Sequence, residues 1–223
     1  MSRHIVLWEV DAQADFMLPG GKLYVAGAEK IIPNIQRLVK AAEERGALIV
    51  SSADAHSVSD PEFKTYPPHC VSGTAGARII PEGLQKHFAT IPNDASHVLR
   101  EDVLRDDVLR NPQVVIETQT LDVFDNPHTS ELVNRLGADA EYVVFGVVTE
   151  LWVRCAAKGL LERGRKVAIV KDAIETLKPE EGKRALAELQ SSGATLITTD
   201  EAIARMVVRE SASAPRVPAE RST

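Results

Sequence analysis

Short apolar runs alternate with helix-like segments along most of this chain, and this alternation restricts the folds open to it. The strand-like runs are residues 5–10, 47–52, 113–117, 142–146, 166–170 and 194–198. Strands separated by helices pair in parallel, and the helices then cover both faces of the sheet. The sequence therefore predicts a three-layer α/β/α fold, doubly wound around a parallel six-stranded sheet.

Helix signals lie between these runs. Residues 28–45 repeat apolar side chains with a 3.6-residue period, and Gly46 follows in the position that often ends a helix. Further helices are predicted at 128–136, 149–163, 180–191 and 200–208. Residues 12–27 are predicted to form a loop, 84–88 a short helix and 101–110 an Asp-rich, solvated connection.

The chain reads as a single domain with a tail. Its 223 residues, 44% of them hydrophobic, suit one domain with a core of ordinary size. Residues 1–208 account for every predicted strand and helix. Residues 209–223 are small, polar and proline-containing, so they are expected to be disordered.

The charge pattern excludes several partners. The net charge is −6, and no stripe of basic residues is present to attract nucleic acid. The apolar run near the N-terminus stops at Asp11, too early for a signal peptide or a membrane span. Two distant cysteines, Cys70 and Cys155, favour a reducing, cytoplasmic setting.

A polar loop with metal-binding side chains follows the second predicted strand. Asp54 and His56 are two residues apart, so in extended chain they point to one side. Glu62 and His69 return from the same loop. Two imidazoles with carboxylates suit Zn²⁺, Mn²⁺ or Fe²⁺. The alternative is an ordinary surface loop with a capping Asp and exposed His residues, and spacing alone leaves both interpretations open.

Four stretches together carry a resemblance to a known family. They are VDAQADF (10–16), the loop DAHSVSDPEFKTYPPHCVSGTAG (54–76), VIETQTLDVF (115–124) and GVVTELWVR (146–154). The chain resembles the isochorismatase-like cysteine hydrolase superfamily, and its nicotinamidase branch most closely. The resemblance implies a Rossmann-like fold, a homo-oligomer, a metal held by Asp54, His56, Glu62 and His69, and hydrolysis of a small amide such as nicotinamide to nicotinate.

The resemblance also assigns catalytic positions, and two of them are changed in this chain. Asp11 stands at the position of the general base. The position of the family's lysine holds Thr118, and that of its nucleophilic cysteine holds Trp152. Backbone N–H groups at Val148 and Trp152 correspond to the oxyanion hole, and a cis peptide is implied between Val147 and Val148.

The ligand and the activity follow from the same comparison. Phe16 and Tyr66 stand where the family packs the aromatic ring of its substrate, so a small amide or aromatic carboxylate is the expected ligand. An indole cannot act as a nucleophile, and a threonine brings no charge to stabilise an anion. Thiol catalysis is therefore expected to be lost.

Three hypotheses remain open on the sequence. The first is a non-hydrolytic member that binds a metal and a small ligand. The second is a working amide hydrolase that uses metal-bound hydroxide with Asp11 as base, or Cys155 as a displaced nucleophile. The third is a purely structural metal site in an oligomer-forming scaffold.

Overall fold

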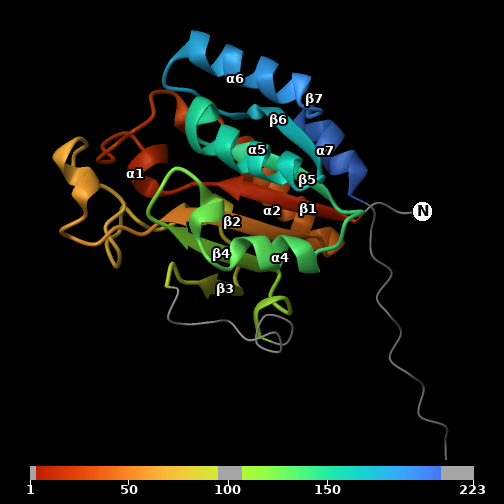
Figure 1. Ribbon diagram of the computed structural model, residues 1–223, viewed down its shortest axis with the longest axis horizontal. Helices are drawn as coiled ribbons and strands as arrows, with labels where there is room; N and C mark the ends of the chain where they lie inside the picture. The colour runs from red at the N-terminus through yellow and green to blue at the C-terminus, as the bar shows by residue number, and fades with distance from the viewer. Residues whose placement is uncertain (1–3, 95–106, 207–223) are drawn as a thin grey trace, which may run out of the picture.

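A single parallel sheet forms the centre of the computed structural model, which describes residues 4–94 and 107–206. Its strand order is β3-β4-β2-β1-β5-β6-β7, and every paired neighbour runs parallel (Figure 1). The strands are β1 (Ile5–Val10), β2 (Leu48–Asp54), β3 (Phe88–Ile91), β4 (Gln113–Thr118), β5 (Glu141–Gly146), β6 (Lys166–Ile174) and β7 (Thr195–Ile197). The predicted parallel α/β architecture is confirmed.

The prediction of six strands was wrong by one, because β3 was missed. Residues 84–88 were expected to be helical, but Phe88 instead begins a four-residue strand on the free edge of β4. This strand is half-exposed and lacks a continuous apolar run, so no strand pattern marks it. The Gln113 side chain accepts a hydrogen bond from the backbone N–H of Gln85 and fixes the approach to the edge.

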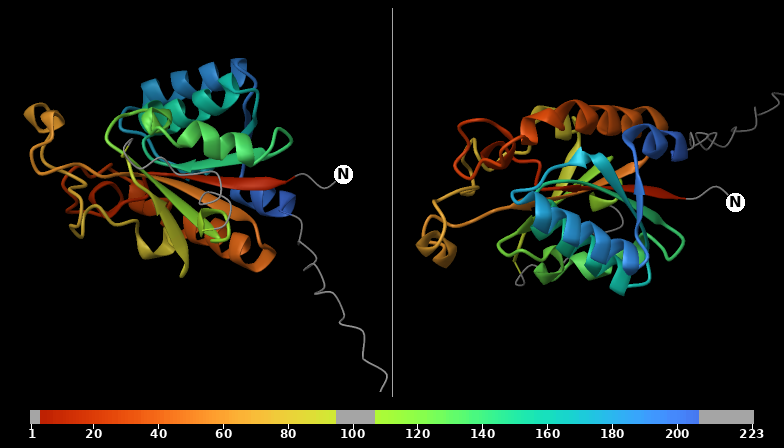
Figure 2. Two further views of the ribbon diagram at one scale, coloured as in Figure 1. Left: turned by 60° about the horizontal axis from the view of Figure 1, so that its bottom comes forward. Right: turned by 90° about the horizontal axis from the view of Figure 1, so that it is seen from above.

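Helices cover both faces of the sheet. They are α1 (Ala14–Met17), α2 (Ile32–Arg45), α4 (Thr129–Arg135), α5 (Arg154–Glu162), α6 (Pro179–Ser191) and α7 (Thr199–Arg205). Figure 2 shows α2 and α7 on one face, with α4, α5 and α6 on the other. The predicted layers are therefore present.

Two segments differ locally from the prediction. Residues 12–27, expected to be a loop throughout, contain the short helix α1. The segment expected as one helix over 149–163 begins with a π-helical turn, Thr149–Val153, before α5. The peptide bond between Val147 and Val148 is cis, as expected.

Some predictions fall outside the described residues. They concern the tail 209–223, the last residues of the helix predicted at 200–208 and most of the connection 101–110. Within residues 4–94 and 107–206, none of the helices has the length and apolarity needed to cross a membrane.

The carboxyl end of the central strand β1 marks where a ligand site is expected. β1 is followed by α2 and its neighbour β5 by α5, and these helices lie on opposite faces of the sheet, which makes the β1/β5 boundary a topological switch point (Figure 2). Ligands of open α/β sheets bind at the carboxyl ends of the strands beside such a point. Gly146 closes β5 there, and an added Cβ would lie 2.0 Å from the carbonyl oxygen of Val10.

Candidate functional site

Three of the four predicted metal ligands meet in a buried group. Asp54 ends β2, and its Oδ2 atom lies 3.5 Å from His56 Nε2 and 3.7 Å from His69 Nε2. The ligand atoms of the three residues lie within 4.8 Å of one another, and all three side chains are buried. The spacing between these donor atoms fits a single ion bound among them.

The polar loop after β2 folds back to bring the two imidazoles together. The backbone N–H of His56 donates to the carbonyl of Cys70, and the N–H of Ser72 donates to the carbonyl of His56. This short parallel bridge places His69 beside His56 across the 12 residues between them, with ring centroids 4.9 Å apart. The predicted convergence within the loop is therefore present.

Each imidazole turns its Nδ1 atom away from the shared centre. His56 Nδ1 lies 3.1 Å from Asp60 Oδ2, and His69 Nδ1 lies 2.9 Å from the carbonyl of Pro67. Metal-binding histidines usually hold their second ring nitrogen in this way. The buried Nε2 atoms have no hydrogen-bond partner within the described residues. The donor set therefore fits a divalent ion bound through both Nε2 atoms.

Negative charge dominates this group. Burial alone would lower the pKa of His56, but the carboxylates of Asp54 and Asp60 outweigh it and raise the pKa to about 9. The pKa of His69 is raised as well, against the effect of burial, by Asp54 and the Pro67 carbonyl. The site thus favours a positive charge, which a bound cation would supply.

Asp11 lies next to this group in a fully buried position. It follows β1 directly, with a φ of 47°, and its Oδ1 accepts a 2.6 Å hydrogen bond from the Ser52 hydroxyl. Its Oδ2 has no partner among the described residues. Burial and the nearby Asp54 charge raise the pKa of Asp11 well above its usual range.

Two residues after β1, Gln13 just before α1 and Asp15 within it, fix the group, and sequence reasoning did not single them out. The Gln13 side chain donates to the Asp54 carbonyl at 2.7 Å and accepts from the Asp54 N–H at 2.8 Å. Asp15 accepts from the N–H of Cys70 at 2.8 Å, next to His69. Both lie in the stretch VDAQADF. The signal that could have identified them is a polar side chain among residues that are otherwise buried.

A cavity of about 470 Å³ adjoins the metal group. Among its lining residues are Phe16 and Tyr66, the predicted ligand-packing residues, and Val148 and Trp152, the predicted oxyanion positions. Glu62 also lines it, and its Oε1 lies 3.9 Å from His69 Nε2. Glu62 therefore connects the cavity to the imidazoles, and it is the most loosely placed of the four predicted ligands.

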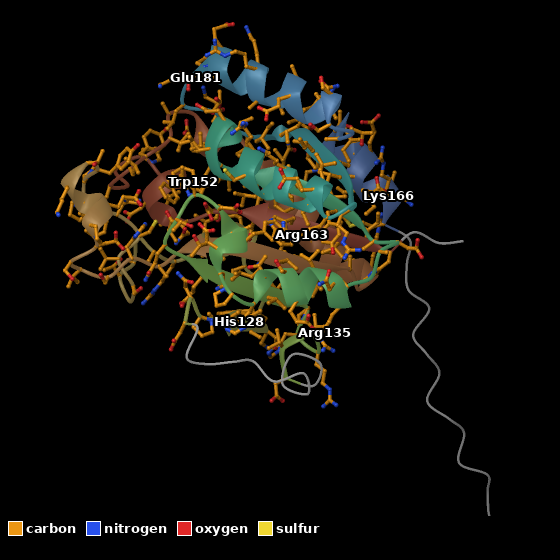
Figure 3. The ribbon with its side chains drawn as sticks, viewed as in Figure 1. His128, Arg135, Trp152, Arg163, Lys166 and Glu181 are labelled. Atoms are coloured by element: carbon orange, nitrogen blue, oxygen red, sulfur yellow. The ribbon has the colours of Figure 1, made fainter. Side chains whose placement is uncertain are left out.

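Trp152 is packed against the aromatic wall of this cavity. Its ring centroid lies 5.3 Å from that of Phe16, which in turn lies 5.5 Å from the His69 ring. Only 7% of Trp152 is exposed, and Figure 3 shows it at the start of the helical segment after β5. The indole therefore stands beside Phe16, between the cavity and the protein interior.

Thr118 occupies the end of β4, opposite Asp54 in the strand register. Its hydroxyl donates to the carbonyl of Thr120 at 2.7 Å and is buried. The hydroxyl also accepts a hydrogen bond from the Thr120 N–H at 3.2 Å, so a local turn holds the side chain. Thr118 therefore stabilises the turn that follows β4.

The two cysteines are poor nucleophiles in these surroundings. Burial and the negative charge of Asp122 raise the pKa of Cys155, which lies on α5. Burial and the charge of Asp54 raise the pKa of Cys70 far more. A thiol must ionise to attack, so both environments oppose the reactive form.

Comparisons with known proteins agree with this geometry. The family model of the isochorismatase domain matches residues 5–90 and 100–201. A nicotinamidase of Escherichia coli is 24% identical over 210 residues, which cover 85% of this chain and 92% of that protein. A probable inactive nicotinamidase of Arabidopsis thaliana is 28% identical over 87 residues, which cover 35% of this chain and 44% of that protein.

A solved structure matches over nearly the whole chain as well. The pyrazinamidase of Pyrococcus horikoshii, in complex with zinc, superposes with a TM-score of 0.69 at 28% identity. The match covers 87% of this chain and 99% of that one. With the family model matching most of its length, the chain belongs to the isochorismatase domain family.

Proposed function

We propose that this chain binds one divalent metal ion and a small ligand, and that it has lost the cysteine-based amide hydrolysis of its relatives. The observation that carries the proposal is Trp152, a buried indole at the position assigned to the nucleophile. Thr118, at the position assigned to the lysine, adds a second loss. The buried Asp54, His56 and His69 support a retained metal site.

Asp54, His56 and His69 would hold the metal, with Glu62 completing the set from the rim of the cavity. A divalent ion there supplies a positive charge that can polarise a donor atom of a ligand. Zn²⁺, Mn²⁺ and Fe²⁺ all accept two imidazoles with carboxylates. The zinc complex of the pyrazinamidase relative supports Zn²⁺ as the first ion to test.

The ligand would lie in the cavity beside Trp152. Phe16 and Tyr66 offer ring faces and edges for an aromatic group, and Val148 adds an apolar contact. Pocket volumes of about 300–1,000 Å³ are usual for small ligands, and 470 Å³ falls within that range. A small aromatic amide or related molecule therefore matches the size and lining.

Asp11 favours a second candidate function, an amide hydrolase without a cysteine. Its unpartnered Oδ2 and raised pKa are features of a group that exchanges protons during a reaction. Such an enzyme would use Asp11 to accept a proton from an attacking water. The raised pKa of Cys155 opposes the version in which this thiol replaces the nucleophile.

The proposal also includes the oligomeric state of the protein and its location in the cell. We expect a homo-oligomer, which multi-angle light scattering of the purified protein would measure. A cytoplasmic protein is expected from the two unpaired thiols, Cys70 and Cys155. A monomer across a range of concentrations would contradict the first expectation without bearing on the metal site.

Ammonia release from nicotinamide, measured with saturating zinc, manganese or ferrous ion, separates the two functions. The proposal predicts a rate equal to that of Asp11→Ala in every case. A rate well above background that disappears in Asp11→Ala would overturn it in favour of the hydrolase. The nicotinamidase relative makes nicotinamide the natural first amide to test.

A further inference from the structure

The cavity beside Trp152 is bounded by carboxylates as well as by aromatic rings. Glu62, Glu150 and Glu181 line it, and Lys178 is the only basic residue among its described lining residues. The lining therefore carries two formal negative charges in excess. An apolar pocket with this balance does not suit an anionic ligand, because like charges at close range repel each other.

The single cation is already neutralised. Lys178 Nζ lies 3.1 Å from Glu181 Oε1, in an ion pair one turn apart at the start of α6. Both side chains are largely exposed, so water screens the pair. Lys178 is therefore not set up as an anchor for a carboxylate.

Glu150 is the buried charge of the cavity. It is 9% exposed, and its Oε1 accepts a 2.7 Å hydrogen bond from the backbone N–H of Lys178. Its Oε2 accepts a hydrogen bond from the Thr176 hydroxyl. Donors to both oxygens hold the carboxylate in place without a cation. The charge is thus fixed in the wall.

A metal ion at the neighbouring group would not reverse this balance. The carboxylates of Asp54 and Glu62 together carry two negative charges, which balance the two positive charges of a divalent ion held between them. Glu150 then remains as the uncompensated charge of the cavity wall, since Glu181 is paired with Lys178. The preference for positive charge therefore holds with or without the metal.

Aromatic rings provide the second requirement for binding an organic cation. Phe16 and Trp152 pack with centroids 5.3 Å apart at a 44° tilt, and Tyr66 adds a third ring that is 48% exposed. A cation over an aromatic face is attracted by the ring quadrupole, most strongly where water is excluded. Leu121 and Leu177, both about half-exposed, extend the apolar rim.

We infer that this cavity selects a small organic cation, an ammonium group carried on an aromatic or alkyl body, over a neutral amide or an aromatic carboxylate. The inference rests on the proposed function, which makes the cavity a ligand site, and adds the charge of the ligand. The apolar body packs on Phe16 and Trp152, while the positive group faces the side of the cavity that holds Glu150. Figure 3 shows Trp152 and Glu181 at the same end of the molecule, on adjacent segments.

Isothermal titration of the zinc-loaded protein with three probes of similar size tests this directly. The probes are benzyltrimethylammonium, benzamide and benzoate, which carry positive, zero and negative charge. We expect the cation to bind about tenfold more tightly than benzamide, with benzoate weakest. The advantage of the cation over benzamide should shrink as salt is raised, since salt screens charge. The same order is expected after the metal is removed with a chelator.

Two variants and a control assign the effect to the cavity. Glu150→Gln should remove most of the advantage of the cation. Glu181→Gln keeps the buried wall intact but frees Lys178, and it should improve benzoate binding. Glu43→Gln removes an exposed charge on α2, away from this cavity, and should change none of the three affinities. A cation preference unchanged in both cavity variants would overturn the inference.

The outcomes separate this inference from the proposed function. Benzoate or benzamide binding as tightly as the cation would overturn the inference and leave the ligand site standing. Absence of binding by all three probes would contradict the proposed ligand site itself, and the inference with it.

Discussion

At the scale of single residues, the site combines retained and replaced side chains. Asp11 and Asp54 lie at the ends of β1 and β2, and the loop after β2 brings His56 and His69 to Asp54. Trp152 packs on Phe16 instead of presenting a nucleophile. Within one site, the side chains expected to bind a metal are therefore present, while the position expected to hold a nucleophile carries an indole.

Restoring the two replaced positions should restore chemistry. Trp152→Cys opens space beside Phe16 and supplies a thiol at the start of the helical segment, and Thr118→Lys supplies a charge that favours the thiolate. The double variant is expected to release ammonia from nicotinamide at least about a hundredfold faster than the parent. Adding Asp11→Ala should abolish the gain. A folded double variant with no gain would contradict the assignment of these positions.

Glu9 is a buried carboxyl in β1, two residues before Asp11, and it predicts a pH effect on stability. Burial raises its pKa to about 8, although the Ser51 hydroxyl donates to it at 2.7 Å. The folded protein thus holds this proton to higher pH than the unfolded chain, whose pKa is near 4.5. The contribution is fully present below pH 4.5 and is lost as the pH rises towards 8.

Urea unfolding at a series of pH values between 4.5 and 9 measures this effect. The parent should lose on the order of 3 kcal/mol relative to Glu9→Gln across this interval, since glutamine does not ionise. Titrating groups that the Glu9 charge does not influence cancel in the comparison, whereas Asp11, whose pKa Glu9 helps to raise, belongs to the measured difference. Parallel stability profiles for the two proteins would show that Glu9 stays ionised in the fold.

At the scale of elements, the loop after β2 builds the metal group. The bridge between His56 and Val71 returns the chain to β2, and Asp15 holds the N–H of Cys70 from the α1 segment. The sequence predicted which side chains of this loop would come together, because their types and spacing are chemical signals. It did not identify the contacts that bring them together, because those depend on chain reversal in three dimensions.

Asp60 should tune the metal site without binding in the shared centre. Its carboxylate lies 3.1 Å from His56 Nδ1 and orients the ring. Asp60→Ala is expected to weaken zinc affinity about 10- to 100-fold, the usual effect of losing such a partner. Competition with a fluorescent chelator measures the change. Asp139→Ala, an exposed turn residue, is the matched control, and equal affinities for the two variants would refute the role of Asp60.

At the scale of the whole molecule, alternating strands and helices specify the sheet. Continuous apolar runs predicted β1, β2, β4, β5 and β6, because strands buried on both faces need them. A shorter apolar run predicted β7, which lies at the edge of the sheet. β3 escaped prediction because it lies at the edge with one residue of four buried. The cavity also escaped, since its lining comes from several loops and helices that only the complete fold brings together.

The fold should be sensitive to cavities in its core and tolerant at its surface. Leu38 on α2 is fully buried, whereas its neighbour Lys40 is exposed. Leu38→Ala is expected to lower the free energy of unfolding by about 2–5 kcal/mol, and Lys40→Ala by less than about 0.5 kcal/mol. Chemical denaturation monitored by circular dichroism compares the two. Equal losses would show that α2 does not pack as described.

The metal content of the whole protein tests the central claim most directly. After zinc loading and exhaustive dialysis, elemental analysis should find about one zinc per chain in the parent and in Trp152→Cys. His56→Ala, checked for folding by circular dichroism, should retain almost none. Retention by the parent would establish a metal site that persists without the nucleophile. A parent protein that holds no more zinc than His56→Ala would contradict the account.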